Sequence, residues 1–434
     1  MTRQKIPSAL ARGLAVITLG AALFAAHPAG AGGLLLYEVG TADVGLAGAG
    51  WSARVQDAST VLTNPAGMTN LEGTQILTGL QALYGNMPFD VGPLTSTALG
   101  SRGGNPVGWF PGGGAFLTHR MSPDLALGLA VTGNFGLAQE FDDDWAGRYY
   151  VQRAALLGVS VLPAISYRLG ESVSVGAAAN VVYGLLKNRV AINNITGPDG
   201  RLDLDDTAWG CGVNLGLLYD TGAGTRAGLT YTSQVALGFE APAEFSGLAD
   251  GLATVLAARG LLDADIGLGL RVPQTVMLSG YRQVSPRVAL LGSAGWQEWS
   301  RFGRVNVSVE SDDPINLTTE SSFQDTWHGA LGLQHQTSAT LRLDLGVGYD
   351  SGFQKSGSIS PALPADSAWR FGLGLKKQAR PGFGWGAGVE YVYGGTLDVN
   401  KQSATPVALG GRGDLVGSYA TSMVFLSGSL EWRF

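Results

Sequence analysis

The residues of this 434-residue chain that could carry out chemistry are few, and their spacing does not assemble a catalytic centre. None of the histidines stands in a metal-ligand spacing such as H-E-x-x-H, and no G-x-x-x-x-G-K-[ST] phosphate loop is present. A hydrolase would also need a nucleophile and a base close together, and Ser321 and Ser322, which are near His328, are typical loop residues. The histidines are His27, His119, His328 and His335. We therefore expect no enzyme, no catalytic residue, no cofactor and no bound metal.

Two acidic clusters and one cysteine are the remaining candidates. Asp142–Asp144 and the group Asp203, Asp205 and Asp206 could bind Ca²⁺ or bridge lipopolysaccharide through divalent ions, although solvated loop charges are the simpler interpretation. Cys211 is the only cysteine, which excludes an internal disulfide. It lies in the apolar phase of the segment 209–219, so we interpret it as a small wall residue.

The elements that carry these residues are strands, because apolar and small or polar side chains alternate along most of the chain. Every second residue back from the C-terminus is apolar or small, whereas the intervening positions hold mostly polar residues such as Glu431 and Arg433. Alternate side chains of a strand point to opposite faces, so each such segment shows one apolar face. The apolar series is Trp432, Leu430, Gly428, Leu426 and Val424. About fourteen segments of this kind follow one another from Thr74 to Phe434. We expect them at 74–85, 113–120, 125–135, 155–167, 172–187, 208–219, 226–239, 266–283, 288–309, 323–336, 340–351, 368–378, 383–399 and 419–434.

Composition indicates that these strands close into a transmembrane barrel. Charged residues are 14% and hydrophobic residues 45% of the chain, with 66 glycines, yet no apolar run beyond the N-terminal segment approaches a spanning helix. Only a closed barrel then satisfies the backbone groups in lipid. Mid-strand charges fall in one phase, which suits a lumen and not a soluble sandwich. The predicted fold is an all-β, about 14-stranded antiparallel outer-membrane β-barrel.

The N-terminal residues 1–31 are predicted to be a signal peptide. Arg3, Lys5 and Arg12 precede the apolar run 13–26, and Ala29-Gly30-Ala31 is a typical cleavage site. An exported barrel belongs in the bacterial outer membrane, in contact with its lipid and lipopolysaccharide, and nothing in the chain suggests a nucleic-acid partner.

Residues 32–73 lack strand alternation and precede the barrel 74–434. Their low charge and apolar side chains argue against a solvated tail. We expect this segment to fold back into the lumen as a hatch.

The connections between strands alternate in length, and the long ones are expected outside the cell. One long loop predicts a helix from Ser246 to Gly260, whose apolar face could capture substrate or simply pack on a neighbouring loop. That face holds Leu248, Leu252, Val255 and Leu256. Apolar residues in the lumen phase predict a path inside the barrel, formed by Leu156, Leu162, Met423 and Phe425.

Several runs resemble the FadL-type outer-membrane transporters of long-chain fatty acids and aromatic hydrocarbons. The most specific is the pre-barrel segment with Asn64-Pro65-Ala66, which matches that family's Asn-Pro-Ala motif. Asparagine before proline is also an ordinary helix start, so its place within the hatch is what makes the match informative. Further similar runs are 134–141, 145–149, 270–275 and 299–302.

The resemblance implies a monomeric barrel closed by the hatch. It also implies that hydrophobic substrate is captured at external loops and leaves sideways through a gap at a kinked third strand, beside Asn64-Pro65-Ala66. The kink would lie at Gly133, Asn134, Phe135 and Gly136, although these glycines could instead only ease strand curvature.

Passive uptake of hydrophobic small molecules is therefore the favoured function, and a general diffusion porin or a structural, adhesive barrel is the alternative. The sequence leaves fatty acids and aromatic hydrocarbons both open as substrates. A fatty acid would benefit from a cation such as Arg148, Arg189 or Arg370.

Overall fold

A computed structural model describes residues 37–434, apart from residues 259, 263, 303, 311–314, 321–322 and 355–358. The predicted signal peptide and residues 32–36 lie outside the described residues, as do Ser321 and Ser322.

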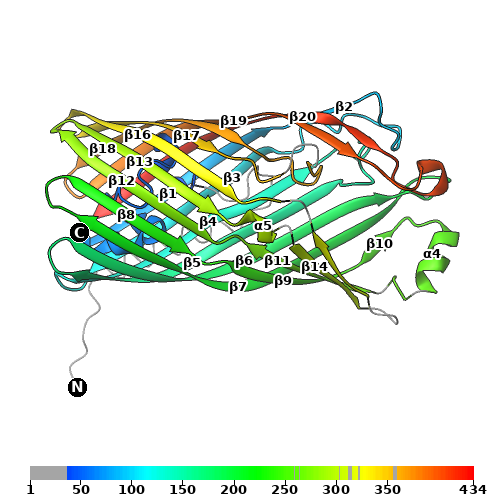
Figure 1. The fold of residues 1–434 in the computed structure, drawn as a ribbon, viewed down its shortest axis with the longest axis horizontal. Coiled ribbons are helices and arrows are strands. Elements are labelled where there is room, and N and C mark those ends of the chain that lie inside the picture. The colour runs from blue at the N-terminus through cyan, green and yellow to red at the C-terminus, as the bar shows by residue number, and fades with distance from the viewer. Residues whose placement is uncertain are drawn as a thin grey trace, which may run out of the picture.

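The described chain forms a closed antiparallel barrel, which is elongated along its axis (Figure 1). Each strand pairs with the next, and the first pairs with the last, from Gln75 opposite Arg433 to Asn86 opposite Ser422. Fourteen strands of the described residues form this wall, which confirms the predicted fold. In order they are β1 Thr74–Asn86, β3 Gly108–Arg120, β4 Leu125–Glu140, β5 Arg153–Leu169, β6 Val173–Ile192, β7 Gly200–Asp220, β8 Thr225–Thr232, β12 Thr275–Ser285, β13 Val288–Gln297, β16 Thr326–Ser338, β17 Leu341–Asp350, β18 Ala368–Arg380, β19 Phe383–Lys401 and β20 Leu415–Arg433.

The two phases of the strands face opposite environments, as the alternation predicts. Leu426 and Leu430 of β20 are exposed on the outer face, whereas Phe425 and Glu431, which belong to the other phase, are buried inside. Cys211 is exposed on the outer face of β7, which agrees with its assignment as a wall residue. An outer face of this kind suits contact with lipid hydrocarbon.

The two ends of the barrel differ. Short turns and the C-terminus lie at one end, and longer connections extend from the other (Figure 1). In outer-membrane barrels the short turns are periplasmic. The external connections contain β2 Phe89–Val91, which pairs with β20, β10 Glu244–Ser246, which pairs with β7, and the short 3₁₀ helix η2 Val407–Leu409.

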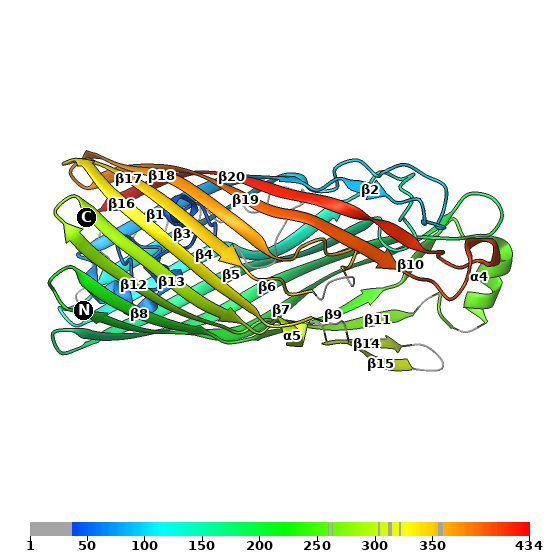
Figure 2. The same cartoon turned by 45° about the horizontal axis from the view of Figure 1, so that its top comes forward.

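Three of the expected strands, 226–239, 266–283 and 288–309, are wrong as continuous elements. Each leaves the wall partway, and the outer parts join one further strand, from the expected loop 310–322, in a separate four-stranded sheet in the order β15-β14-β11-β9 (Figure 2). Two local features mark these breaks. Pro273 has no backbone N–H to donate to a neighbouring strand. Just after β8, the Val213 N–H of β7 donates to the side-chain Oγ of Ser233 at 2.9 Å, where a regular ladder would offer a backbone carbonyl. These elements are β9 Val235–Pro242, β11 Asp265–Val272, helix α5 Trp299–Phe302, β14 Arg304–Glu310 and β15 Ile315–Glu320.

The outer sheet packs against the lumen face of β6 and β7. Leu237 and Phe239 of β9 are about 1% exposed, and both lie within contact distance of a Cβ placed on Gly184 of β6. The expected strand at 226–239 therefore ends as wall at Thr232 and continues as a lining of the external half of the lumen.

The predicted helix from Ser246 to Gly260 is shorter in the structure. Helix α4 spans Asp250–Ala257, its N-cap is Ala249 without a side-chain cap, and Ser246 belongs to β10. Among the described residues, no helix is long and apolar enough to cross a membrane.

Candidate functional site

Residues 37–73, which we call the hatch, lie inside the barrel near its periplasmic end (Figure 2). They contain the short helices α2 Asp43–Leu46 and α3 Thr60–Thr63 and the 3₁₀ helix η1 Pro65–Asn70. Nearly all of these residues are buried. The hatch touches every one of the fourteen wall strands, so it spans the bore from side to side.

Glycines in the wall allow this close contact. A Cβ built on Gly228 would lie 1.9 Å from the Ser52 carbonyl oxygen, and one on Gly346 would lie 2.1 Å from the Leu46 carbonyl carbon. Similar clashes would follow at Gly79, Gly176, Gly216 and Gly372. These distances are far below van der Waals contact, so the glycines form a track into which the hatch backbone fits.

Asn64 anchors the hatch to this track. Its Nδ2 donates to the Ser52 carbonyl at 2.6 Å and to the Leu217 carbonyl at 3.1 Å, while its Oδ1 accepts from Ala66 N–H at 3.1 Å. Asn64 is also the N-cap of η1 with Pro65 at the first position, which is the ordinary helix start that the sequence offered. Asn64 and Pro65-Ala66 lie against Gly216 of β7 and Gly176 of β6, whereas the resemblance placed the motif beside the third strand, β4.

One side of the lumen carries buried charges. Arg370 of β18 pairs with Glu38 of the hatch, with Asp350 and, at 3.0 Å, with Glu390. His328 Nδ1 lies 2.7 Å from Asp350 Oδ1. These contacts join the start of the hatch to β16–β19.

A second group of charges lies closer to the periplasm. Lys376 contacts Asp57 of the hatch at 3.1 Å and Glu431 at 2.6 Å, and Arg54 contacts Asp43 at 3.0 Å. Burial alone would raise the pKa of Asp57, but the neighbouring Lys376 and Arg54 hold that pKa well below its usual range. Asp57 is therefore an anion that ties the hatch to β18.

The other side of the lumen holds a pocket between the hatch and the wall. About 830 Å³ of atom-free space, including solvent at its mouth, lies beside Tyr37 and Trp51 of the hatch. Tyr37 is fixed by Gln297 Nε2, which donates to its hydroxyl at 2.7 Å, and its ring packs on Trp51 and His328. The wall lining is Phe135, Ser160, Asn180, Val182, Asn214, Thr230, Thr232, Ser233, Val235, Val272, Pro273, Thr275, Val276, Met277, Trp296 and Gln297.

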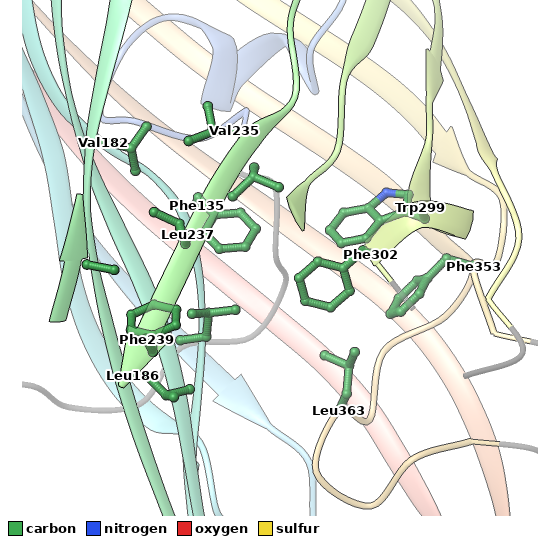
Figure 3. Close-up of a cluster of buried hydrophobic side chains, with 13 residues drawn as sticks. Phe135, Val182, Leu186, Val235, Leu237, Phe239, Trp299, Phe302, Phe353 and Leu363 are labelled. Carbon is green, nitrogen blue, oxygen red and sulfur yellow. The ribbon is translucent and has the colours of Figure 1, made fainter. Parts of the chain in front are cut away.

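A cluster of buried apolar side chains continues from this pocket toward the outside. Phe135, Val182, Val235 and Val272 belong to both the pocket and the cluster. Figure 3 shows Trp299, Phe302 and Phe353 on one side of the cluster and Leu186, Leu237 and Phe239 on the other. Apolar side chains therefore continue from the external half of the lumen to the pocket at the hatch.

The third wall strand, β4, has a β-bulge beside the pocket. Thr132 lies opposite Ser160 of β5 and Phe135 lies opposite Gly158, so three steps on β4 match two on β5. The inward phase changes there, because Thr132 and Phe135 are both buried. Pairing of β4 with β3 ends at Thr132 opposite Gly114, although β3 continues to pair with β1 as far as Gly108. The bulge opens the ladder between β3 and β4 next to Phe135.

The predicted lumen residues do not form one continuous path. Leu156 belongs to the external apolar cluster, and Leu162 packs against the hatch with Met68 and Val61. Phe425 is buried near Val44 on the other side of the barrel, with Met423 partly buried beside it. All four face inward. The clusters of Leu156 and Leu162 both reach the pocket, the second through Leu62 and Trp51 of the hatch, whereas the cluster of Phe425 and Met423 does not.

The remaining candidates from the sequence are three arginines, the acidic clusters and the apolar face of α4. Each of the three arginines proposed for a carboxylate is already ion-paired, Arg148 to Asp199, Arg189 to Asp203 and Arg370 to three carboxylates. No group of three acidic or histidine side chains that could hold a metal is found among the described residues. The α4 residues Leu252 and Leu256 are partly buried and Val255 is 49% exposed.

Comparison with known proteins places this architecture in a family. Residues 22–434 match the family described as outer membrane protein transport protein (OMPP1/FadL/TodX). The chain belongs to this OMPP1/FadL/TodX family. It is 26% identical over 396 residues to a long-chain fatty acid transport protein of Escherichia coli O6:H1, covering 83% of this chain and 87% of that protein.

Solved OMPP1/FadL/TodX structures share the fold. The chain resembles a Pseudomonas aeruginosa FadL homologue with a TM-score of 0.77 and 20% identity, over 93% of this chain and all of that one. It also resembles the Ralstonia pickettii toluene transporter TbuX with a TM-score of 0.67 and 15% identity, over 92% and 99% of the two chains. The protein is thus an outer-membrane barrel of a family that transports hydrophobic compounds, which confirms the predicted location and class.

Sequence reasoning missed most of the pocket. Tyr37, Trp51, Asn180 and Asn214 come from segments far apart in the chain. Polar side chains in the lumen phase of β6 and β7 were a usable signal, but alternation alone does not tell which lumen position meets the hatch.

Proposed function

We propose that this protein takes up hydrophobic small molecules passively, from external capture to the pocket beside Tyr37 and Trp51, and releases them sideways between β3 and β4. Transport of hydrophobic compounds across the outer membrane follows from the family. Among its relatives, one is named a long-chain fatty acid transport protein and another a toluene transporter, so both classes of molecule are candidate substrates.

The observation that carries the sideways route is the open ladder beside the pocket. Phe135 lines the pocket and follows the point at which β3 and β4 stop pairing. A molecule at this position is next to a stretch of the wall in which β3 and β4 are no longer paired, beyond Gly114 and Thr132 toward the outside. Leaving there brings it directly into hydrocarbon, whereas moving through the hatch would expose apolar surface to the buried charges around Arg54 and Lys376.

The fit of the hatch also supports lateral release. The hatch backbone lies against glycines of β6, β7, β8, β17 and β18, and Asn64 hydrogen-bonds to the wall. Displacing the hatch as a unit would break all of these contacts at once, whereas the seam between β3 and β4 is already open.

The test is deletion of Asn134, one residue of the bulge. Because Gly133 and Asn134 lie where β5 has the single residue Val159, the deletion keeps Phe135 opposite Gly158 and lets β4 continue its pairing with β3. We expect uptake of labelled toluene or oleate, measured in cells lacking the natural gene and complemented with each version, to fall at least about tenfold, the loss expected for a blocked obligatory step.

Binding to the purified protein provides the control, since the deletion leaves the other pocket residues in place. Retained binding with lost uptake supports lateral release. Unchanged uptake by the folded deletion variant refutes it, and unchanged uptake of every apolar compound upon loss of the gene refutes the transport function itself.

A further inference from the structure

The pocket is lined by two asparagines on neighbouring strands. Asn180 on β6 lies opposite Gly212, and Asn214 is two residues further along β7, so the two side chains are diagonal neighbours on the lumen face. Asn214 also lies directly opposite Thr232 of β8. Together with the hydroxyls of Thr230, Thr232 and Ser233 they give the pocket an uncharged polar lining beside its apolar residues.

Both side chains are buried, and their amide oxygens are unpaired among the described residues. Asn180 is 5% exposed and Asn214 is 4% exposed, and neither amide oxygen has a hydrogen-bond partner within the described part of the chain. Buried side-chain amides in folded proteins are normally hydrogen-bonded. Two neighbouring unpaired amide oxygens that line a cavity are therefore suited to a guest that donates a hydrogen bond.

The charge of that guest is restricted by its surroundings. Every described residue that lines the pocket is uncharged. Arg370, whose guanidinium lies 5.4 Å from the centroid of the Tyr37 ring, is shared by three carboxylates. An ionised carboxylate placed beside Asn180 would lose its hydration without gaining a cation, which is strongly unfavourable.

We infer that the pocket selects uncharged amphiphiles, molecules with an apolar body and one hydroxyl or protonated carboxyl group that hydrogen-bonds to Asn180 and Asn214. The apolar body lies against Phe135, Val182 and Val235, at the start of the external apolar cluster. This inference rests on the proposed transport function and names its substrate class. It favours alcohols and protonated acids over the carboxylate anions that a fatty acid presents at neutral pH.

The test compares octan-1-ol, octanoate and octane as ligands of the whole protein in lipid nanodiscs. Calorimetric titration at pH 8, with empty nanodiscs to correct for partition into lipid, gives the three affinities. We expect octan-1-ol to bind roughly tenfold more tightly than octane, the ratio typical of one good hydrogen bond, and octanoate to bind more weakly than octan-1-ol by at least that ratio. Octanoate binding should then strengthen as the pH falls through the pKa of the free acid, because the protonated form is the one recognised.

Variants separate the amides from the apolar pocket. Asn180→Leu and Asn214→Leu should each remove most of the preference for octan-1-ol over octane while octane still binds. Asn188→Leu is the matched control, since Asn188 lies on the same strand and phase as Asn180 but outside the pocket, and it should keep the preference. Thr232→Lys, which places a cation opposite Asn214, should make octanoate bind at pH 8.

The outcomes distinguish the inference from the proposed function. Equal affinities for octan-1-ol and octane, a preference for octanoate at pH 8, or a preference that survives both leucine substitutions in folded protein would each overturn the inference, and apolar uptake would still stand. If none of the three ligands binds and loss of the gene leaves their uptake unchanged, the proposed transport function has failed instead.

Discussion

At the scale of single residues, glycine determines how closely the hatch approaches the wall. A Cβ built on Gly216 would lie 2.1 Å from Asn64 Oδ1, and one on Gly176 would lie 2.3 Å from Ala66 N. The Asn-Pro-Ala motif and these two glycines are therefore complementary parts of one contact, although more than a hundred residues separate them in the chain. The high glycine content of the sequence has a structural reason in this contact and in others like it.

Replacing Gly216 by alanine tests this contact. We expect Gly216→Ala to lower the free energy of unfolding by about 1–3 kcal/mol, the usual penalty for overpacking, because the backbone of β7 and Asn64 cannot both keep their places. Urea unfolding in lipid vesicles measures the change. Gly280→Ala is the control, since a Cβ on Gly280 of β12 meets nothing within 4 Å, and we expect a change below about 0.5 kcal/mol. Equal effects of the two substitutions would show that the glycine track does not hold the hatch.

At the scale of elements, two irregularities in the strands shape the pocket. The bulge at residues 133–134 turns Phe135 inward and ends the pairing with β3. The breaks after Thr232 and before Thr275 release β9 and β11, which then line the external half of the lumen. A barrel of regular strands would have neither the seam nor the apolar lining, so the route for substrate depends on departures from regular pairing.

Helix α4 tests the predicted external capture site. The variant Leu252→Ser combined with Val255→Ser removes apolar surface from a helix that has no buried residues, so we expect little effect on folding. If α4 captures substrate, uptake of labelled oleate at low concentration should fall about threefold or more, in proportion to the apolar surface lost, while binding to the pocket of the purified protein stays unchanged. Normal uptake at every concentration would assign α4 to loop packing instead.

At the scale of the whole molecule, the lumen is divided lengthwise. The pocket and the apolar cluster occupy the side formed by β4–β13 and the outer sheet, whereas the ion pairs around Arg370 and Lys376 occupy the side formed by β16–β20. The hatch contacts both sides and all wall strands. This division keeps an apolar molecule away from the charges and leaves the charges to hold the hatch in place.

A hatch that spans the bore predicts a barrel closed to ions. In planar bilayers, the purified protein should show no steady conductance comparable to that of a general diffusion porin measured in the same lipid. The reason is that the hatch, residues 37–73, blocks a water-filled passage along the barrel axis. A large and continuous conductance from folded, full-length protein would contradict this and would favour the porin alternative.

The residue and element scales differ in how far the sequence predicts them. Alternation at positions such as Leu426 and Leu430 correctly identified the outer face, because successive side chains of a strand point to opposite faces whatever the rest of the fold is. The same rhythm could not show that the segments 226–239 and 266–283 leave the wall, since β9 and β11 keep the alternation after the break. Helix α4 was predicted as an element, but its start at Asp250 was missed because Ser246 pairs with β7.

The sequence by itself determined that this chain is an exported, strand-built barrel with a motif-bearing segment ahead of it, since these properties follow from composition, period and local motifs. Only the tertiary structure decided where the lumen is apolar and where it is charged. Tyr37, Asn180, Asn214 and Thr275 meet only because the wall closes around the hatch and brings distant strands to one level of the barrel. The paired states of Arg148, Arg189 and Arg370 have the same origin, because an ion pair depends on distance in space and the sequence records only distance along the chain.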